Sequence, residues 1–567
     1  MIAKRLLPAL AAALAATLAC GLAHAAAPAK APVFVGTDAP MASNAIYFVL
    51  TDRFVDGDTS NDHRDQGGAH PTWDIPVPGA PKGESANIGY LGGDFKGVLD
   101  NAGYIKGMGF GAVWITPIVD NPDEAFTGGD PVSWGSKFTD RGKTGYHGYW
   151  GVNFYKVDEH LPSKGLDYRQ FTAGMHKAGL KVVQDIVLNH GSPAFTMPVK
   201  QPQYGQIFDK QGKLVADEQN LPPYQLDPVR NPLHRFYHAY DDLVQLSNND
   251  DQNPAVLDYF VGAYLQWIDE GSDAFRIDTI SHMSTTFWKQ FSARIRAKHP
   301  GFFMYGEAFD YSPDNIGKFT WPSSGSISVL DFPLRGRLGD VFEHPDSDYA
   351  QILDRLYLTN GPYQNPYELV TFYDNHDMAR LNATDDGFID ANNFLFTARG
   401  IPAIYYGSEI GFERGKAEHQ GNRNYFGQAR IDDAPKSPIY QHLKAIATLR
   451  EKTPALQRGL MLPIRFAGQQ ASFYRVYQQG STHQIALVLL NKGDQPATFK
   501  VDQWLQGGTW HPAFGDGQPV AVADGSPLDA TVGPHDVQVY LLDARVQRPD
   551  LLAELTRLQE ERGHPAH

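Results

Sequence analysis

The residues of this chain that are best suited to chemistry lie at the ends of short apolar segments. They comprise four carboxylates, an arginine and two histidines, and no nucleophilic-serine motif accompanies them. In chain order they are Asp185, His190, Arg276, Asp278, Glu307, His376 and Asp377. Carboxylates that face a common cleft can serve as nucleophile and acid in glycoside hydrolysis. A zinc site is the alternative use of these residue types, but no His-x-His or His-Glu-x-x-His spacing supports it.

The segment 271–279 shows how such residues can be positioned. It has the character of a short buried strand, in which Arg276 and Asp278 share one face because side chains alternate. A guanidinium beside a carboxylate favours its ionised form and fixes its direction. A purely structural ion pair explains this segment equally well when it is considered alone.

Eight apolar segments alternate with helical segments and predict a (β/α)8 barrel, an α/β fold whose active sites lie at the C-terminal ends of the strands. The predicted strands are 44–50, 111–117, 180–187, 271–279, 302–305, 327–330, 368–373 and 401–406. The predicted helices include 171–178, 254–269, 287–297, 349–358 and 439–451. The residues named above would therefore converge on one rim of the barrel.

Composition shifts divide the chain into further parts. We expect the barrel to occupy 41–190 and 251–453, with an irregular inserted subdomain at 191–250 after the third strand. Short alternating segments over 454–545 predict a C-terminal all-β domain. A helical tail over 546–567 carries leucines at helical spacing and is expected to dock on the body.

The N-terminus predicts export. Residues 1–25 combine two basic residues, an apolar run and an Ala-His-Ala cleavage pattern, which is typical of a secretory signal peptide, and 26–40 read as a linker. We therefore expect a secreted or periplasmic protein. The only cysteine, Cys20, lies in the signal segment, and the residues before it fit a lipid-attachment motif poorly.

The net charge of −15 argues against nucleic acid or an anionic membrane as partner, and no membrane span is expected. The sequence gives no oligomeric state.

An early polar turn is rich in calcium-type ligands. Asp56, Asp58, Asn61 and Asp62 supply the short oxygen-bearing side chains that Ca²⁺ prefers. A solvated turn is the alternative, because the spacing is not that of an EF-hand.

Four segments resemble, in order and spacing, the signature regions of the α-amylase family of glycoside hydrolases. They are 185–190, 273–278, 306–309 and 372–377, and the similarity covers roughly 42–545. The resemblance implies a (β/α)8 barrel with an inserted subdomain and a C-terminal β-sandwich. It also implies cleavage of α-1,4-glucosidic bonds in starch, maltodextrin or cyclic glucans, with retention through a covalent glycosyl-aspartate.

By this resemblance Asp278 would be the nucleophile, Glu307 the general acid/base, and Asp377 the residue that binds hydroxyls and helps distort the ring. Glu307 has no arginine neighbour in sequence and lies among aromatic residues such as Phe309, an apolar setting that would raise its pKa. The residues implied in substrate binding are Tyr149, His147, His190, Arg276, His376 and Asp185.

The resemblance also implies calcium as cofactor. An N-terminal site like that of the cyclodextrin glucanotransferase branch would use Asp56, Asp58, Asn61, Asp62, Gly92 and Asp94. A second calcium would use Asn189, His282 and an aspartate, but Gln245 stands where the aspartate is expected. Ser281 stands where many starch-cleaving members carry a lysine.

Three functions remain open at this point. A hydrolase is favoured over a cyclodextrin glucanotransferase-like transferase, because such transferases normally add two further C-terminal domains; a cyclomaltodextrinase is a further alternative. A catalytically inactive glucan-binding scaffold is disfavoured, because Asp278, Glu307 and Asp377 are all present.

Overall fold

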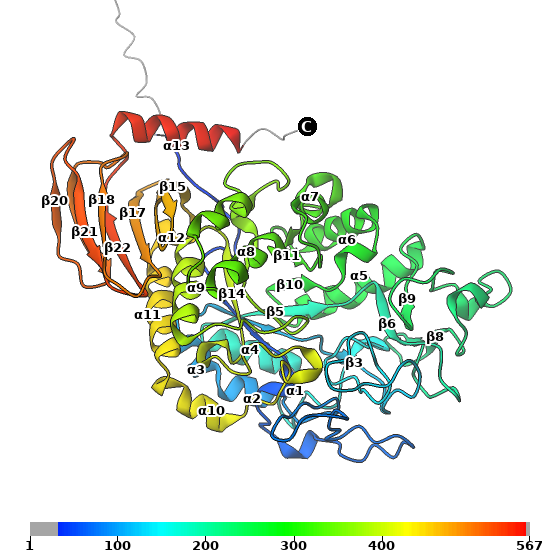
Figure 1. The fold of residues 1–567 in the computed structure, drawn as a ribbon. Coiled ribbons are helices and arrows are strands. Elements are labelled where there is room, and N and C mark those ends of the chain that lie inside the picture. The colour runs from blue at the N-terminus through cyan, green and yellow to red at the C-terminus, as the bar shows by residue number, and fades with distance from the viewer. Residues whose placement is uncertain (1–31, 563–567) are drawn as a thin grey trace, which may run out of the picture.

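The computed structural model describes residues 32–562, which form a barrel flanked by an inserted subdomain on one side and a β domain on the other (Figure 1). The predicted signal segment 1–25, with Cys20, lies outside the described residues. No helix among residues 32–562 is both long and apolar enough to cross a bilayer.

Eight parallel strands form the barrel. Their order is β12-β11-β10-β5-β2-β1-β14-β13, and a parallel bridge between Leu330 and Val370 joins the two ends. The strands are β1 (Ile46–Val49), β2 (Ala112–Ile115), β5 (Lys181–Ile186), β10 (Ala274–Ile277), β11 (Phe303–Gly306), β12 (Ser328–Val329), β13 (Val370–Thr371) and β14 (Ile401–Tyr405). Most side chains of these strands are apolar because helices cover the outside and side chains fill the inside. Charged residues such as Asp185 in β5 and Arg276 in β10 lie among them. The predicted barrel and its eight strands are confirmed.

The outer helices begin at side-chain caps. Asp167, Asn253 and Ser284 each accept a backbone N–H in the first turn of the helix that follows. The helices around the barrel are α2 (Phe95–Asp100), α3 (Ala102–Gly107), α4 (Tyr168–Lys177), α5 (Pro254–Asp269), α6 (Thr285–Lys298), α8 (Phe332–Phe342), α9 (Asp385–Thr397) and α11 (Pro438–Lys452).

The helix predicted at 349–358 is wrong. Tyr349–Arg355 forms a 3₁₀ helix, and the helix that follows β12 is α8. The sequence carried the signal for α8: Asp331 caps Leu334 N, and Pro333 stands in the first turn. Asp331 also pairs with Arg399 at 2.6 Å, and both side chains are fully buried.

Asp331→Ala should destabilise the fold by about 3–5 kcal/mol, because it removes a cap and leaves a buried guanidinium without its carboxylate. Urea unfolding followed by circular dichroism measures this change. Asp340→Ala is the matched control, because Asp340 lies in the same helix and pairs with Arg337 at a half-exposed position. A loss of about 1 kcal/mol or less in both variants would contradict the prediction.

The inserted subdomain contains short strands where an irregular chain is expected. β6 (His190–Pro193) pairs with β9 (Leu246–Asn248), and β7 (Gln206–Phe208) pairs with β8 (Leu214–Asp217). β6 begins shortly after β5 ends, and His190 stands opposite Asn248. This pairing fixes His190 at the junction of barrel and subdomain.

The C-terminal domain is an antiparallel β domain, as predicted. Its six-stranded sheet has the order β15-β16-β17-β22-β19-β20, and β18 and β21 form a second, two-stranded sheet. The strands are β15 (Leu460–Ala467), β16 (Gln470–Gln479), β17 (Thr482–Asn491), β18 (Ala497–Val501), β19 (Gly508–Phe514), β20 (Val520–Val522), β21 (Leu528–Val532) and β22 (Asp536–Leu542).

The final helix, α13 (Pro549–Glu561), docks on the body as expected (Figure 1). Its buried face carries Leu551, Leu555 and Leu558. Residues 32–40, the described part of the predicted linker, also pack on the body: Phe34 is buried and pairs with Gln478.

Candidate active site

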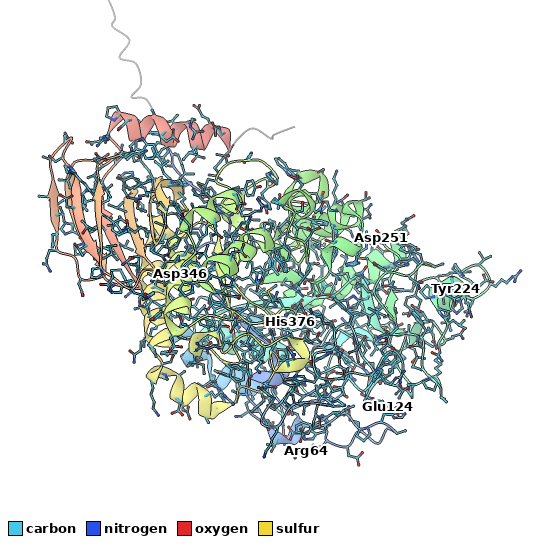
Figure 2. The ribbon with its side chains drawn as sticks, in the orientation of Figure 1. Arg64, Glu124, Tyr224, Asp251, Asp346 and His376 are labelled. Carbon is cyan, nitrogen blue, oxygen red and sulfur yellow. The ribbon has the colours of Figure 1, made fainter. Side chains whose placement is uncertain are left out.

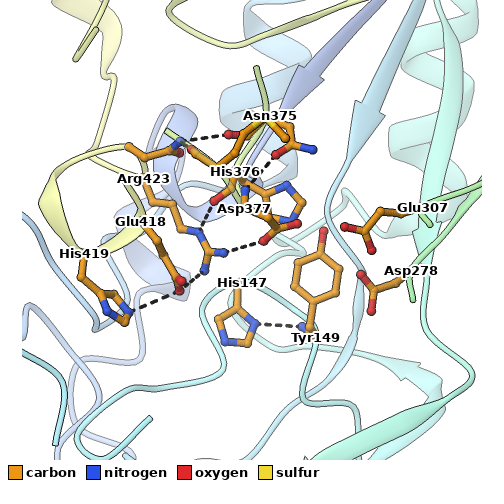
Figure 3. Close-up of polar contacts among 12 residues, drawn as sticks. His147, Tyr149, Asp278, Glu307, Asn375, His376, Asp377, Glu418, His419 and Arg423 are labelled. Carbon is orange, nitrogen blue, oxygen red and sulfur yellow. Dashed lines mark hydrogen bonds and ion pairs between the residues drawn. The ribbon is translucent and has the colours of Figure 1, made fainter. Parts of the chain in front are cut away.

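A cavity of about 470 Å³ lies at the C-terminal ends of the barrel strands. Asp278, Glu307 and Asp377 line it together, although they follow three different strands. Figure 2 shows His376 near the middle of the barrel, whereas Tyr224 lies at the outer tip of the inserted subdomain. Figure 3 shows the carboxylates of Asp278 and Glu307 on the same side of the Tyr149 ring. The structure therefore brings the three predicted catalytic carboxylates together.

Arg276 is the charged centre beneath this cavity. Its NH1 donates to Asp278 Oδ1 at 2.8 Å and to Asp185 Oδ1 at 2.9 Å, and its NH2 lies 3.4 Å from Glu307 Oε2. One guanidinium therefore reaches three carboxylates and fixes the separation of Asp278 and Glu307. The side chain is fully buried, so these ion pairs lie in a medium of low dielectric.

Glu307 has a charged neighbour that the sequence did not reveal. Arg276 lies beside it, and the predicted aromatic neighbour Phe309 is 52% exposed, so the predicted apolar setting is wrong in detail. Burial nevertheless raises the pKa of Glu307 to about 8; Arg276 opposes this rise, and Asp278 and Asp377 add to it. A protonated carboxyl at neutral pH can donate a proton.

The backbone after β10 is strained where it meets Glu307. Thr279 N donates to Glu307 Oε2 at 3.2 Å, and Thr279 has the left-handed conformation φ 47°, ψ 41°. A β-branched residue is rare in this region, and such strain persists only where the surrounding packing enforces it.

Asp377 is held by a neutral histidine and a buried arginine. Its Oδ2 lies 3.0 Å from His376 Nε2, and its Oδ1 accepts from Arg423 NH2 at 2.8 Å. Burial raises the pKa of Asp377 to about 6, and the charges of Arg423 and Arg276 oppose this rise.

The predicted sugar-binding histidines line the cavity in neutral form. Burial lowers the pKa values of His147, His190 and His376, so each presents one donor and one acceptor near neutral pH. Tyr149 stacks on His376 with ring centroids 5.3 Å apart. Neutral imidazoles and an aromatic ring suit an uncharged hydroxylated ligand.

Asp185 and Arg276 lie beneath the cavity, which differs from the substrate contact expected of them. Both are fully buried and neither lines the cavity. Asp185 Oδ2 accepts from Tyr149 Oη at 2.8 Å and from Trp114 Nε1 at 3.0 Å. Through these contacts Asp185 orients Tyr149, and Arg276 orients Asp278 and Glu307.

Two parts of the cavity wall were not among the predicted substrate-binding residues. Lys143, Glu418 and Arg423 form one side, and the exposed Phe309 and Val244 border another. Glu418 and Arg423 belong to the loop after β14, which the barrel rule places on the same rim; that loop was the available signal.

The predicted N-terminal calcium site has a donor set that fits a cation. Asp56 Oδ1, Asn61 Oδ1 and Asp62 Oδ1 are buried and have no hydrogen-bond partner within residues 32–562. Gly92 has φ 89°, and a Cβ there would lie 2.7 Å from Asp62 Oδ1 and 3.3 Å from Asp56 Cγ. Burial and the neighbouring carboxylates of Asp62 and Asp94 raise the pKa of Asp56 to about 6. Unpaired oxygens and mutual repulsion are what a calcium ion relieves.

Two predicted ligands of this site have other partners. Asp58 Oδ1 accepts from Ser60, and Asp94 caps α2 by accepting from Gly97 N at 2.6 Å. No group of three or more His, Cys, Asp or Glu side chains in the described part of the chain has a ready-made metal geometry. The cradle therefore depends on amide oxygen as well as carboxylates.

The predicted second calcium site fits a calcium ion less well than the N-terminal site does. His282 Nδ1 is already paired with Asp242 Oδ1 at 2.7 Å, and Gln245 donates to Asp140. Of Asn189, His282 and Gln245, only Asn189 has a buried amide without a hydrogen-bond partner among the described residues. Gln245 thus bonds to protein where a carboxylate ligand was expected.

Comparison with known proteins identifies similar sequences and a matching family. A family model described as the α-amylase catalytic domain matches residues 48–439. The cyclomaltodextrin glucanotransferase of Thermoanaerobacterium thermosulfurigenes is 28% identical over 525 residues, which cover 88% of this chain and 67% of that protein. The chain spans between 55% and 70% of the length of the curated relatives it matches.

Two solved structures are similar over nearly their whole length. CldA, described as the first cyclomaltodextrin glucanotransferase with a three-domain ABC distribution, superposes with a TM-score of 0.70 at 30% identity, covering 88% of this chain and 99% of CldA. An Anoxybacillus α-amylase superposes with a TM-score of 0.68 at 25% identity, covering 89% and 99%. Because the family model spans well over half of the chain and includes Asp278, Glu307 and Asp377, the chain belongs to the α-amylase family.

Proposed function

We propose that this protein is a retaining glycoside hydrolase that cleaves α-1,4-glucosidic bonds in starch, maltodextrins or related α-glucans. The observation that carries the proposal is the shared contact of Asp278 and Glu307 with Arg276, at 2.8 and 3.4 Å. A retaining mechanism needs two carboxyl groups close together, one ionised and one protonated at the start. The raised pKa of Glu307 supplies the protonated partner.

In this mechanism Asp278 attacks the anomeric carbon while Glu307 protonates the leaving oxygen. The bond to the leaving sugar breaks as the glycosyl-aspartate bond forms. Glu307, now ionised, accepts a proton from water, which attacks the same carbon and releases the sugar with its original configuration. Asp377 and the neutral His190 and His376 bind the hydroxyls of the reacting ring.

A transferase is the second candidate, in which a sugar hydroxyl replaces the attacking water. Phe309 and Val244, each about half exposed at the cavity, offer an apolar surface on which an acceptor sugar can stack. Chain length does not separate the two candidates, contrary to the expectation from sequence. CldA is described as a glucanotransferase with three domains, and this chain covers 99% of it.

Product analysis tests the proposal. Purified protein without residues 1–25 is incubated with soluble starch and with maltoheptaose, and products are followed by chromatography and ¹H NMR. Hydrolysis with retention gives shorter maltooligosaccharides that appear first as α-anomers. Longer or cyclic products would assign the transferase, and binding without any product would support the inactive scaffold.

The pH dependence of kcat/KM should be a bell with limbs near pH 6 and pH 8. Glu307 must be protonated, so activity is lost as pH rises through its pKa of about 8. Asp377 must be ionised, so activity is lost as pH falls through its pKa of about 6. Initial rates at low substrate concentration from pH 4 to 10 measure both limbs. Full activity at pH 9.5 would contradict the role given to Glu307.

We also propose that the cradle of Asp56, Asn61 and Asp62 binds Ca²⁺ as a structural ion. Adding calcium should raise the melting temperature, by an amount equivalent to about 2.7 kcal/mol at 100 times Kd. Asp56→Asn should abolish the calcium-dependent shift in differential scanning calorimetry. Asp65→Asn is the control, because Asp65 lies in the same turn and its exposed carboxylate accepts from Gly67 N. An unchanged melting temperature with calcium, in wild type, would refute the site.

Export is proposed on the signal pattern of residues 1–25. N-terminal sequencing of protein recovered from the periplasm or medium of a bacterial host tests it. A mature N-terminus at Ala26 supports cleavage after the Ala-His-Ala pattern.

A further inference from the structure

The loop after β14 joins the catalytic rim through one arginine. Arg423 Nε donates to the backbone oxygen of His376 at 2.9 Å, and NH2 donates to Asp377 Oδ1 at 2.8 Å. NH1 lies 2.9 Å from Glu418 Oε1. Figure 3 shows Arg423 between Asp377 and Glu418. All three nitrogens of the guanidinium are thus engaged, two of them by the dipeptide that carries the predicted ring-distorting carboxylate.

Glu418 also forms an ion pair with Lys143, which belongs to a second loop. Its Oε1 lies 3.3 Å from Lys143 Nζ and 3.3 Å from His419 Nε2. Lys143 also pairs with Asp140 at 2.9 Å, and Asp140 accepts from Gln245 of the inserted subdomain. Charges therefore alternate along Asp377, Arg423, Glu418, Lys143 and Asp140.

This arrangement joins three segments that meet only in the folded barrel. Arg423 and Lys143 are buried although they line the cavity, so their charges are little screened. A buried cation with three acceptors in fixed directions has one orientation. The orientation of the Asp377 carboxylate follows from it.

We propose that Arg423 is a positioning residue for Asp377, and that Glu418, held by Lys143, sets how strongly the charge of Arg423 acts on that carboxylate. This inference rests on the proposed glycosidase function of the same cavity. It assigns to the loop after β14 the control of the carboxylate that holds the sugar hydroxyls.

The electrostatic consequences have opposite signs. Arg423 favours the ionised form of Asp377, whereas Glu418 disfavours it and partly cancels the arginine. Removing the cation should therefore raise the pKa of Asp377, and removing the anion should lower it. The titratable or charged groups that face Asp377 are His376 beside it, Arg276 in β10, Asp278 after β10, Glu307 after β11, and Arg423 and Glu418 after β14.

The test compares Arg423→Gln and Glu418→Gln. Arg423→Gln should lower kcat/KM about 100-fold, as expected when a buried charge pair is broken, and move the acidic limb to higher pH. Glu418→Gln keeps the shape of the side chain, should lower kcat/KM about 10-fold or less, and should move the acidic limb to lower pH. Each shift should be about half a pH unit or more.

Two control variants each remove an ion pair made by the same loop away from the cavity. Arg414→Gln removes a cation that pairs with Asp385, and Glu84→Gln removes the partner of Lys416. In both variants the acidic limb of the pH profile and kcat/KM should stay at their wild-type values. The proposal would be overturned if the acidic limb moved in the same direction in the two test variants, or equally far in the controls. Damage to the fold alone does not move the limb in opposite directions.

An activity-free measurement separates this proposal from the proposed function. ¹³C NMR of protein labelled at aspartate carboxyls follows the titration of Asp377, assigned by the resonance lost in Asp377→Asn. Opposite shifts in the two variants support the positioning role even if no α-glucan is cleaved, which would refute only the glycosidase. Unchanged titration in both variants would refute the positioning role even in an active enzyme.

Discussion

Replacing Asp278 by asparagine should lower kcat for α-glucan cleavage by about 10⁴-fold or more, because no covalent glycosyl intermediate can form. Arg276 would keep its contacts with Asp185, so the fold should be retained. The loss should be equal for maltoheptaose and for α-maltosyl fluoride. A fluoride leaving group needs no acid, so an undiminished loss on this substrate identifies a missing nucleophile.

Asp273→Asn is the matched control for this variant. Asp273 precedes the same strand at the opposite end of the barrel, where it accepts from Val182 N at 2.8 Å and pairs with His176. Its replacement should change stability and leave kcat within about 3-fold, since the N-terminal face of a barrel serves stability. Retained turnover in Asp278→Asn, with a folded protein by circular dichroism, would remove Asp278 from the nucleophile role.

Glu307→Gln should lower kcat/KM for maltoheptaose by about 10²–10⁴-fold, the usual range of general acid–base catalysis. The glutamine cannot protonate the leaving sugar, but Asp278 stays in place beside Arg276. Stopped-flow measurement with α-maltosyl fluoride should therefore show a burst of fluoride followed by slow turnover, because water then lacks its base. Azide, which attacks without a base, should restore turnover and give an α-glycosyl azide.

The contrast between the two variants carries the test of their roles. A fluoride burst in Glu307→Gln and none in Asp278→Asn supports nucleophile and acid as assigned. Because fluoride departs without an acid, loss of the burst in both variants would mean that Glu307 is needed for more than protonating the leaving group, and the acid/base role would fall. Glu343→Gln is the control, because Glu343 caps the end of α8 and lies outside the cavity.

The eight strands could be predicted from sequence because most of them lie in short apolar segments, as expected for strands buried on both faces. The helices were less accessible. α9 was not predicted because it buries Asp390, Asn392 and Asn393, so its polar residues do not mark the solvent side. The 3₁₀ segment at Tyr349–Arg355 looked helical because local spacing does not reveal which helix covers β12.

The meeting of three carboxylates at the rim could be predicted without the structure. Asp278, Glu307 and Asp377 each follow a parallel strand, and closing the strands into a barrel brings all their C-terminal ends to one face. The Arg276–Asp278 pair was also readable, because residues two apart on a strand share a face.

The surroundings of those carboxylates depend on contacts between distant parts of the chain. Arg276 touches Glu307 across the two neighbouring strands β10 and β11, whereas Arg423 and Lys143 reach the cavity from loops far apart in sequence. The pKa of a carboxyl depends on burial and on charges within a few ångströms, whatever their distance along the chain. The order of the strands therefore predicted which carboxylates lie at the rim. The packing of strands and loops places the charges that determine the protonation of these carboxylates.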